Sequence, residues 1–169
     1  MKIKLVLLLI FWALAFFIIG AKYAKAETIC SGEVSKILVE KSKKTMTLLD
    51  TTGCAVKTYT VRVGLNKGPK QCEGDKKTPE GIYKIKDKRD SKYVKFLELD
   101  YPRAKDIKRA KELGCNPGSA IGIHYYNKEY TNDPSTLEGS LGCITVWNKS
   151  EIKEIEQMVK VGTVVEIIP

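Results

Sequence analysis

Histidine is almost absent from this sequence of 169 residues, which contains His124 and no other. The five cysteines lie far apart, and no two of them form a Cys-x-x-Cys pair. Structural zinc sites are usually built from such pairs or from several histidines, and catalytic zinc sites need three protein ligands close together. The sequence therefore predicts no metal site, and we expect no cofactor.

The sequence also lacks an apolar run long enough to span a membrane. Its longest run, Leu5–Ile19, has 15 residues, whereas a spanning helix needs about 20. The run follows the basic start Met1–Lys4 and precedes the small residues of Ala24–Ala26, as in a secretory signal peptide. We expect residues 1–26 to be a signal peptide and residues 27–169 to be one domain. An uncleaved anchor is the alternative. In both cases the domain would lie in the periplasm or elsewhere in the extracytoplasmic cell envelope, and after cleavage it would have no stable membrane span.

Aromatic residues are scarce, at 8% of the chain, and they form no cluster with basic residues of the kind that stacks nucleic-acid bases. The whole chain has a net charge of +9. Removing residues 1–26, which hold four lysines and no acidic residue, leaves 25 basic and 20 acidic residues, or +5. A mildly basic exported domain suits an anionic polymer such as the cell wall, although the same charge also serves ordinary solubility. We expect no nucleic-acid partner and a monomeric protein.

Export allows disulfide bonds, and an odd number of cysteines leaves one thiol unpaired. If Cys143 is the free one, the other four allow three pairings. A hairpin with its turn at residues 42–43 would bring residue 30 close to residue 55, as a bridge between neighbouring cysteines requires. This favours the pairs Cys30–Cys54 and Cys72–Cys115, the second by elimination.

Most of the chain has the spacing of strands. Period-two runs and short apolar runs predict strands, while two segments with helical spacing predict short helices. Gly114 would end the first helix, and an Asn148–Glu151 capping box would begin the second. The predicted fold is mainly β, a curved sandwich or barrel-like sheet with two short helices. Trp147 is expected in the core, and the basic face of the first helix in solvent. The predicted strands are 34–40, 45–50, 55–63, 82–85, 96–99, 120–123, 144–146 and 163–168, and the predicted helices are 103–113 and 149–161.

The histidine and one cysteine lie in one stretch with small residues beside the cysteine. His124 follows a short apolar run and Cys143 precedes another, with the 127–139 loop between them as a predicted lid. A cysteine attacks carbonyls as a thiolate, and an imidazole that accepts its proton makes it a usable nucleophile. Gly142 would let backbone N–H groups near Cys143 approach a substrate oxyanion. Ser140 either hydrogen-bonds near the nucleophile or is a turn residue.

Four motifs in this order resemble the signature of the L,D-transpeptidase catalytic domain, the YkuD-like family. They are His124 followed after fifteen residues by Ser140-x-Gly142-Cys143, the stretch 68–83 with its Gly-Asp-x-x-Thr-Pro-Glu-Gly-x-Tyr pattern, Asp100-Tyr101-Pro102, and the stretch 117–124.

The resemblance covers roughly residues 33–168. Two positions depart from it, since many members have Gly at Tyr125 and Arg at Thr145. An arginine contact to a substrate carboxylate is therefore not expected at position 145.

The resemblance implies an exported cysteine acyltransferase that acts on peptidoglycan stem peptides in cell-wall cross-linking or remodelling. Cys143 would attack the L-centre carbonyl of diaminopimelate and release D-Ala, with His124 as the base, and an amine would resolve the thioester. In this family a backbone carbonyl often orients the histidine. Two alternatives remain: a hydrolase of the same fold that trims wall peptides or wall–protein links, and a wall-binding module without catalysis.

Overall fold

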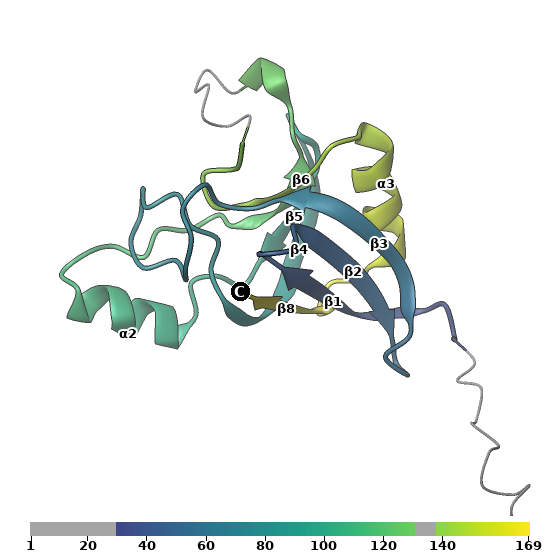
Figure 1. Ribbon diagram of the computed structural model, residues 1–169, viewed down its shortest axis with the longest axis horizontal. Coiled ribbons are helices and arrows are strands. Elements are labelled where there is room, and N and C mark those ends of the chain that lie inside the picture. Colours follow the sequence, from purple (N-terminus) through teal and green to yellow (C-terminus); the bar gives the residue numbers. More distant parts are fainter. Residues whose placement is uncertain (1–29, 131–137) are drawn as a thin grey trace, which may run out of the picture.

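The computed structural model describes residues 30–130 and 138–169. Its eight strands form a closed barrel in the order β1-β2-β3-β7-β6-β5-β4-β8, and β8 pairs with β1 to complete it (Figure 1). The predicted signal peptide and the 131–137 part of the predicted lid lie outside the described residues. The strands are β1 (Val34–Glu40), β2 (Thr45–Asp50), β3 (Ala55–Arg62), β4 (Gly81–Ser91), β5 (Val94–Leu99), β6 (Gly122–Tyr125), β7 (Ile144–Val146) and β8 (Val164–Ile168).

Two short α-helices accompany the barrel, α2 (Ala104–Glu112) and α3 (Lys149–Met158), together with the 3-10 helix η2 (Lys128–Tyr130). α3 packs against β5, β6 and β7, and its Ile152 and Ile155 are fully buried. The predicted mainly β, barrel-like fold with two short helices is confirmed. Within the described part of the chain, no helix has the length and apolar character needed to cross a membrane.

The first three predicted strands form an antiparallel meander, because β1 pairs with β2 and β2 with β3. Alternate residues of β2 are buried, as expected when one face of a strand packs on the core. β4 is longer than the predicted 82–85 strand because it continues through its pairing with β5 as far as Ser91. The Asn148–Glu151 capping box at the start of α3 is also present.

Both predicted disulfide bonds are present, and Cys143 is the free thiol. Cys30–Cys54 joins the start of the chain to the β2–β3 turn, with Cα atoms 5.5 Å apart. Cys72–Cys115 joins the 64–80 loop to the residues after α2, with Cα atoms 5.8 Å apart. The backbone N–H of Glu73 also donates to the Asn116 carbonyl at 2.7 Å, so a covalent bond and a hydrogen bond hold these two segments together.

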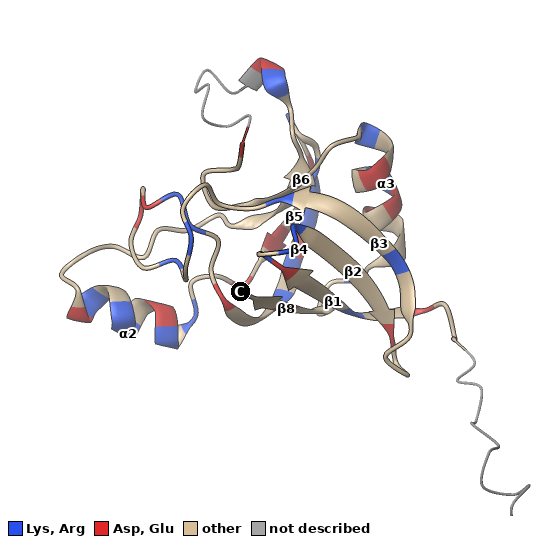
Figure 2. Cartoon of the chain, viewed as in Figure 1, with Lys and Arg blue, Asp and Glu red and all other residues tan. Residues whose placement is uncertain are grey.

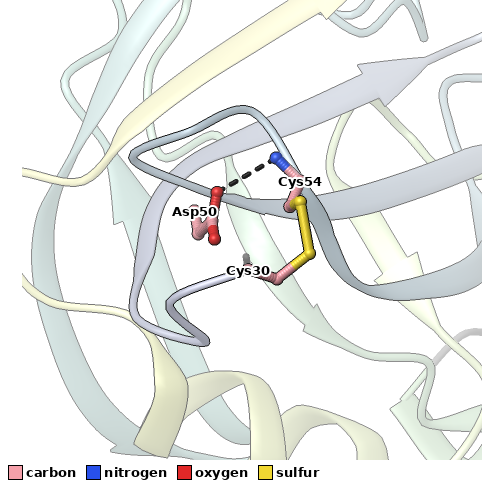
Figure 3. Close-up of side chains that lie close together, drawn as sticks. All are labelled: Cys30, Asp50 and Cys54. Carbon is pink, nitrogen blue, oxygen red and sulfur yellow. Dashed lines mark hydrogen bonds between the residues drawn. A yellow bond between two sulfur atoms is a disulfide. The ribbon is translucent and has the colours of Figure 1, made fainter. Parts of the chain in front are cut away.

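One group of side chains has the composition of a metal site, namely Cys30, Asp50 and Cys54, whose ligand-type atoms lie within 4.8 Å of one another (Figure 3). The two sulfur atoms are bonded to each other. The carboxylate accepts hydrogen bonds from Ser31, Thr52 and the backbone N–H of Cys54. These bonds hold the pKa of Asp50 far below its usual range, although burial acts in the opposite direction. The group therefore closes the β2–β3 turn and offers no thiolate to a cation.

One expectation about side-chain burial is wrong, and a second, the solvated basic face of the first helix, holds for Lys105, Lys108 and Lys111 but not for Arg109. Trp147 is 46% exposed, because it follows the last residue of β7 and lies beyond the core. In α2, the apolar residues Ile107 and Leu113 are half exposed, and the buried positions are Asp106 and Ala110. The Asp106 carboxylate accepts from the Tyr83 hydroxyl at 3.2 Å and from Arg109 at 2.8 Å. α2 is thus attached to the barrel mainly through polar contacts, and Arg109 belongs to them rather than to a solvated face.

Basic residues do not gather on one face of the ribbon. Figure 2 shows them on α2, on the loop beside it and along the strands, with acidic residues between them. Many are paired, as in Lys36–Glu166, Lys57–Glu154 and Arg89–Glu98. Surface ion pairs of this kind contribute little to stability, about 0–1 kcal/mol each. The basic residues are therefore interspersed with acidic ones along the chain in this view.

The two disulfide bonds should differ in what they stabilise. The double variants Cys30→Ser/Cys54→Ser and Cys72→Ser/Cys115→Ser remove cross-links that close 24- and 43-residue separations, so each should lower the free energy of unfolding by about 3–4 kcal/mol. Hydrogen exchange should then rise in residues 68–78 for the second variant only. Equal protection of this loop in both variants would contradict the prediction.

Candidate active site

The pairing of β6 with β7 brings the predicted catalytic residues together. The two strands are parallel, with His124 opposite Thr145 and Ile123 opposite Ile144. Side chains alternate between the two faces of a strand, so Cys143 and Thr145 point the same way as His124. The other face carries Ile123, Ile144 and Val146, all fully buried. The sheet thus separates an apolar face from a face that holds the thiol and the imidazole.

A row of four side chains crosses the sheet on this second face. Arg62 of β3 lies opposite Thr145, Thr145 opposite His124, and His124 opposite Phe96 of β5. Neighbouring strands are about 4.8 Å apart, so adjacent side chains of such a row are within contact distance. Gly122 is needed for this arrangement, because a Cβ atom there would lie 2.6 Å from the Phe96 ring and 2.7 Å from the Leu97 carbonyl oxygen.

Aromatic rings and a backbone carbonyl hold the His124 ring in place. Nδ1 lies 2.8 Å from the carbonyl oxygen of Tyr125, the kind of partner that the family resemblance implies. The ring packs against Tyr93, with centroids 4.2 Å apart, and against Phe96, with centroids 5.6 Å apart. Because Nδ1 must carry the hydrogen to donate to a carbonyl, Nε2 is left as the basic nitrogen.

The Cys143 thiol is partly accessible and donates toward the carbonyl oxygen of Ala120, with a sulfur–oxygen distance of 3.6 Å. Ala120 has φ +55°, in the left-handed region that a residue with a side chain adopts only at a cost. This backbone conformation belongs to the segment that leads into β6 and turns a carbonyl toward the thiol. Strain of this kind concentrates at functional sites.

Hydrogen bonds around Gly142 and Ser140 shape the backbone on which the thiol is carried. The Ser140 hydroxyl donates to the Cys143 carbonyl and accepts from the Gly142 N–H at 3.0 Å. Ser140 therefore both contacts the nucleophile's backbone and closes a turn. The Gly142 N–H is occupied by this bond, so it would have to leave Ser140 to bind an oxyanion, and that role stays a prediction. Gly142 has φ +138°, and a Cβ atom there would lie 3.0 Å from the Lys77 carbonyl oxygen.

Burial keeps both reactive groups neutral in the free protein. It lowers the pKa of His124 to about 4, with the Tyr125 carbonyl acting in the opposite direction and the positive charge of Arg62 lowering it further. It raises the pKa of the Cys143 thiol to about 11, while a backbone hydrogen bond from Gly122 and the charge of Lys70 act to lower it. Near pH 7 the pair is a thiol beside an uncharged imidazole.

The two residues open into one pocket of about 280 Å³. It is bounded by the 64–80 loop, by the segment before β6 and by the residues before β7. Its lining comprises Arg62, Lys70, Glu73, Gly74, Tyr93, Gly118, Ser119, Ala120, Ile121, His124, Tyr126, Asn127, Gly139, Ser140, Leu141, Cys143 and Thr145.

Three buried polar residues of this region escaped the sequence reasoning. Thr78, fully buried, accepts from the Gly64 N–H and donates to the Gly142 carbonyl, both at 2.8 Å, and so ties the loop to the residue before the thiol. Lys70 is 3% exposed and donates to the Cys72 carbonyl and the Asp75 carboxylate. Arg62 stands on the polar side of a period-two run. Arg62 could have been recognised as a pocket residue only from the pairing of β3 with β7, which the sequence does not show.

Comparisons with known proteins bear on the family and the fold of this chain. A family model of the L,D-transpeptidase catalytic domain (YkuD) matches residues 35–167. No curated protein shows significant similarity to the chain. Among solved structures, the helical cell shape determining protein Pgp2 from Campylobacter jejuni is 24% identical, with a TM-score of 0.62 over 79% of this chain and 47% of that chain. Bd1075 from Bdellovibrio bacteriovorus is also 24% identical, with a TM-score of 0.58 over 80% of this chain and 48% of that chain.

The chain spans about half the length of these two structures. A third structure is the catalytic domain of the Enterococcus faecium L,D-transpeptidase, at 20% identity and a TM-score of 0.53. The match covers 80% of this chain and 98% of that domain. At such identities the likeness establishes the fold. The family model matches nearly all of the barrel and establishes more, namely that the chain belongs to the L,D-transpeptidase catalytic domain family.

Proposed function

We propose that the protein is a cysteine acyltransferase that acts on peptidoglycan stem peptides, with Cys143 as the nucleophile and His124 as the base. The observation that carries the proposal is the register of β6 and β7, which places the free thiol and the imidazole on one face of the sheet and in one pocket. The Tyr125 carbonyl supports the role of the base, because it leaves Nε2 unprotonated.

In the proposed reaction the thiol proton passes to Nε2 of His124 as the sulfur attacks a peptide carbonyl. The C–N bond then breaks, the leaving amine takes the proton from His124, and a thioester to Cys143 remains. The incoming amine attacks the thioester, gives a proton to His124, and the thiolate leaves and is reprotonated. Because both groups are neutral at rest, proton transfer and attack would occur together when the substrate displaces water from the pocket.

Backbone amides next to the thiol would stabilise the oxyanion. The Cys143 N–H belongs to the nucleophile's own residue and would be one donor, and the Gly142 N–H would join it only after release from Ser140. In the resting state Ser140 and Gly142 serve to fix the backbone of Cys143. Lys70 supports the thiolate as it forms, since its charge already favours the ionised sulfur.

Hydrolysis of the thioester by water is the second candidate function. It shares every residue named above, so the geometry of the thiol and the imidazole does not separate the two reactions. Incubation of the protein with disaccharide-tetrapeptides and an amine acceptor distinguishes them by mass spectrometry of the products. New cross-linked or amine-exchanged peptides would indicate transfer, and shortened stems alone would indicate hydrolysis.

Removal of either reactive group should abolish turnover without unfolding the barrel. We expect Cys143→Ser and His124→Ala each to lower kcat/KM by at least about 10²–10⁴-fold, because a positioned base alone contributes this much. The control is Lys108→Gln, on the exposed side of α2. If His124→Ala retained wild-type turnover while Cys143→Ser did not, the imidazole would not be the base.

The pH dependence of thiol alkylation should reflect the buried, neutral pair. Since the pKa of the Cys143 thiol is raised to about 11, its thiolate fraction and its rate with iodoacetamide should grow about ten-fold per pH unit between pH 6 and 9.5. With the pKa of His124 lowered to about 4, no step should occur near pH 6.5. Rates measured by mass spectrometry that level off at pH 7 would show a thiolate–imidazolium pair instead. A wall-binding module with an inert thiol would not react at all.

We also propose that residues 1–26 direct export and that the domain works in the periplasm or cell envelope. The two disulfide bonds support this location, since such bonds persist outside the cytoplasm. N-terminal sequencing of the secreted protein would test it, and a first residue at Glu27 is expected.

A further inference from the structure

Unsatisfied polar atoms are concentrated at one place in the described structure. Four buried side-chain nitrogen or oxygen atoms have no hydrogen-bond partner, and three of them belong to one cross-strand pair: Nε and Nη1 of Arg62 and Oγ1 of Thr145. Buried polar groups are nearly always paired, and each exception needs a reason. Here the exceptions share one pocket with Cys143 and His124.

The guanidinium of Arg62 is buried without a counter-charge. The side chain is 3% exposed, and among residues 30–130 and 138–169 no carboxylate pairs with it. Its Nη2 donates to the Gly139 carbonyl, and the rings of Tyr126 and Trp147 lie 3.8 and 5.2 Å from its central carbon. These contacts offset only part of the cost of burying a charge, and the donors on Nε and Nη1 remain unused.

The charged side chains around the pocket differ in how far they are paired. Lys70 lies on the wall formed by the 64–80 loop, with its ammonium group donating to the Cys72 carbonyl and the Asp75 carboxylate. Among the residues that line the pocket, Arg62 and Lys70 are the cations and Glu73 is the acid. Because the Lys70 ammonium is paired with the Asp75 carboxylate, the least compensated cation of the pocket is Arg62, which lies in the same row as His124.

We propose that Arg62 and Thr145 form a carboxylate-binding subsite for the acyl donor. A carboxylate is acceptor-only and matches a guanidinium that has free donors, while the Thr145 hydroxyl supplies a further donor. Within the subsite, Thr145 lies directly opposite His124 on the neighbouring strand and two residues from the thiol, so the subsite would fix the donor peptide relative to both. This inference rests on the proposed acyl transfer and specifies its substrate as a peptide with a free carboxylate close to the attacked carbonyl.

Binding requires a local movement. The unsatisfied atoms are closed to solvent in the free protein, so a carboxylate reaches them only when a side chain above them moves. The rings in contact with the guanidinium, Tyr126 and Trp147, are both partly exposed. The alternative is that Arg62 is purely structural and holds the Gly139 carbonyl next to Ser140.

A charge-paired set of alkylating agents tests the subsite without turnover. Iodoacetate carries a carboxylate and iodoacetamide is its neutral analogue, so the ratio of their rates with Cys143 measures anion attraction to the pocket. For wild-type Cys143, the iodoacetate rate divided by the iodoacetamide rate should exceed the same ratio measured for the glutathione thiol. In Arg62→Gln this ratio should fall about three- to ten-fold. Arg62→Lys should keep much of the ratio, and Lys108→Gln, on the exposed side of α2, should leave it unchanged. Equal losses of both rates in Arg62→Gln would show a structural role and overturn the proposal.

Thr145→Val provides a second test in a variant that should fold. It removes an unsatisfied buried hydroxyl and keeps the shape of the side chain, so the melting temperature should rise. If the hydroxyl binds the donor, KM for a tetrapeptide donor should also rise about ten-fold with less change in kcat, and donors amidated at the free carboxylate should be insensitive to the substitution. An unchanged KM with the free-carboxylate donor would overturn the proposal. Absence of any acyl transfer by the wild type would refute the proposed function instead, because the alkylation ratio is measured independently.

Discussion

The parallel alignment of β6 with β7 is the constraint on which the site depends. A shift of one residue in this pairing would move the reactive side chain of one strand to the opposite face of the sheet. The alignment is held from both sides. On one face Ile123, Ile144 and Val146 are fully buried, and α3 packs against β5, β6 and β7. On the edge, Gly122 allows β6 to lie directly against Phe96 and Leu97.

The second support comes from a loop without regular structure. The 64–80 segment is joined to the residue before the thiol through Thr78 and to the segment before β6 through Cys72–Cys115 and the Glu73–Asn116 hydrogen bond. Arg109 of α2 donates to the Lys70 carbonyl at 2.6 Å, so the helix also helps to place the lysine beside the pocket. The walls of the pocket are therefore tied to one another by covalent and polar contacts, while the barrel core supplies the floor.

The site contains buried charged and polar groups that destabilise the free protein, and the rest of the fold offsets this cost. A neutral thiol and a neutral imidazole are the forms that a water-poor pocket favours. The charge of Lys70 lowers the pKa of the thiol and favours the thiolate, whereas the charge of Arg62 lowers the pKa of His124 and opposes the imidazolium. The uncompensated guanidinium and the unpaired Thr145 hydroxyl are costs in the free protein. Natural proteins keep such groups mainly where a ligand completes them, at some expense of stability.

The sequence by itself determined much of this protein. Alternation within residues 34–62 gave the opening meander, the hairpin at 42–43 gave the first disulfide pair, and the spacing from His124 to Cys143 identified the two residues that meet in the pocket. These features depend on near neighbours in the chain or on motifs of fixed order, so they can be predicted from the sequence alone.

Only the tertiary structure decided which distant residues complete the site. Arg62 and Thr145 become partners because β3 pairs with β7 across more than 80 positions of the chain. Trp147 and Ile107 look like core residues in the sequence but lie exposed, because their segments end at or beyond the barrel's surface. Long-range strand pairing has no local signature in the sequence, and the burial of a residue depends on which distant segments of the chain pack against it. For that reason the charge of the pocket follows from the closed barrel and not from the order of residues alone.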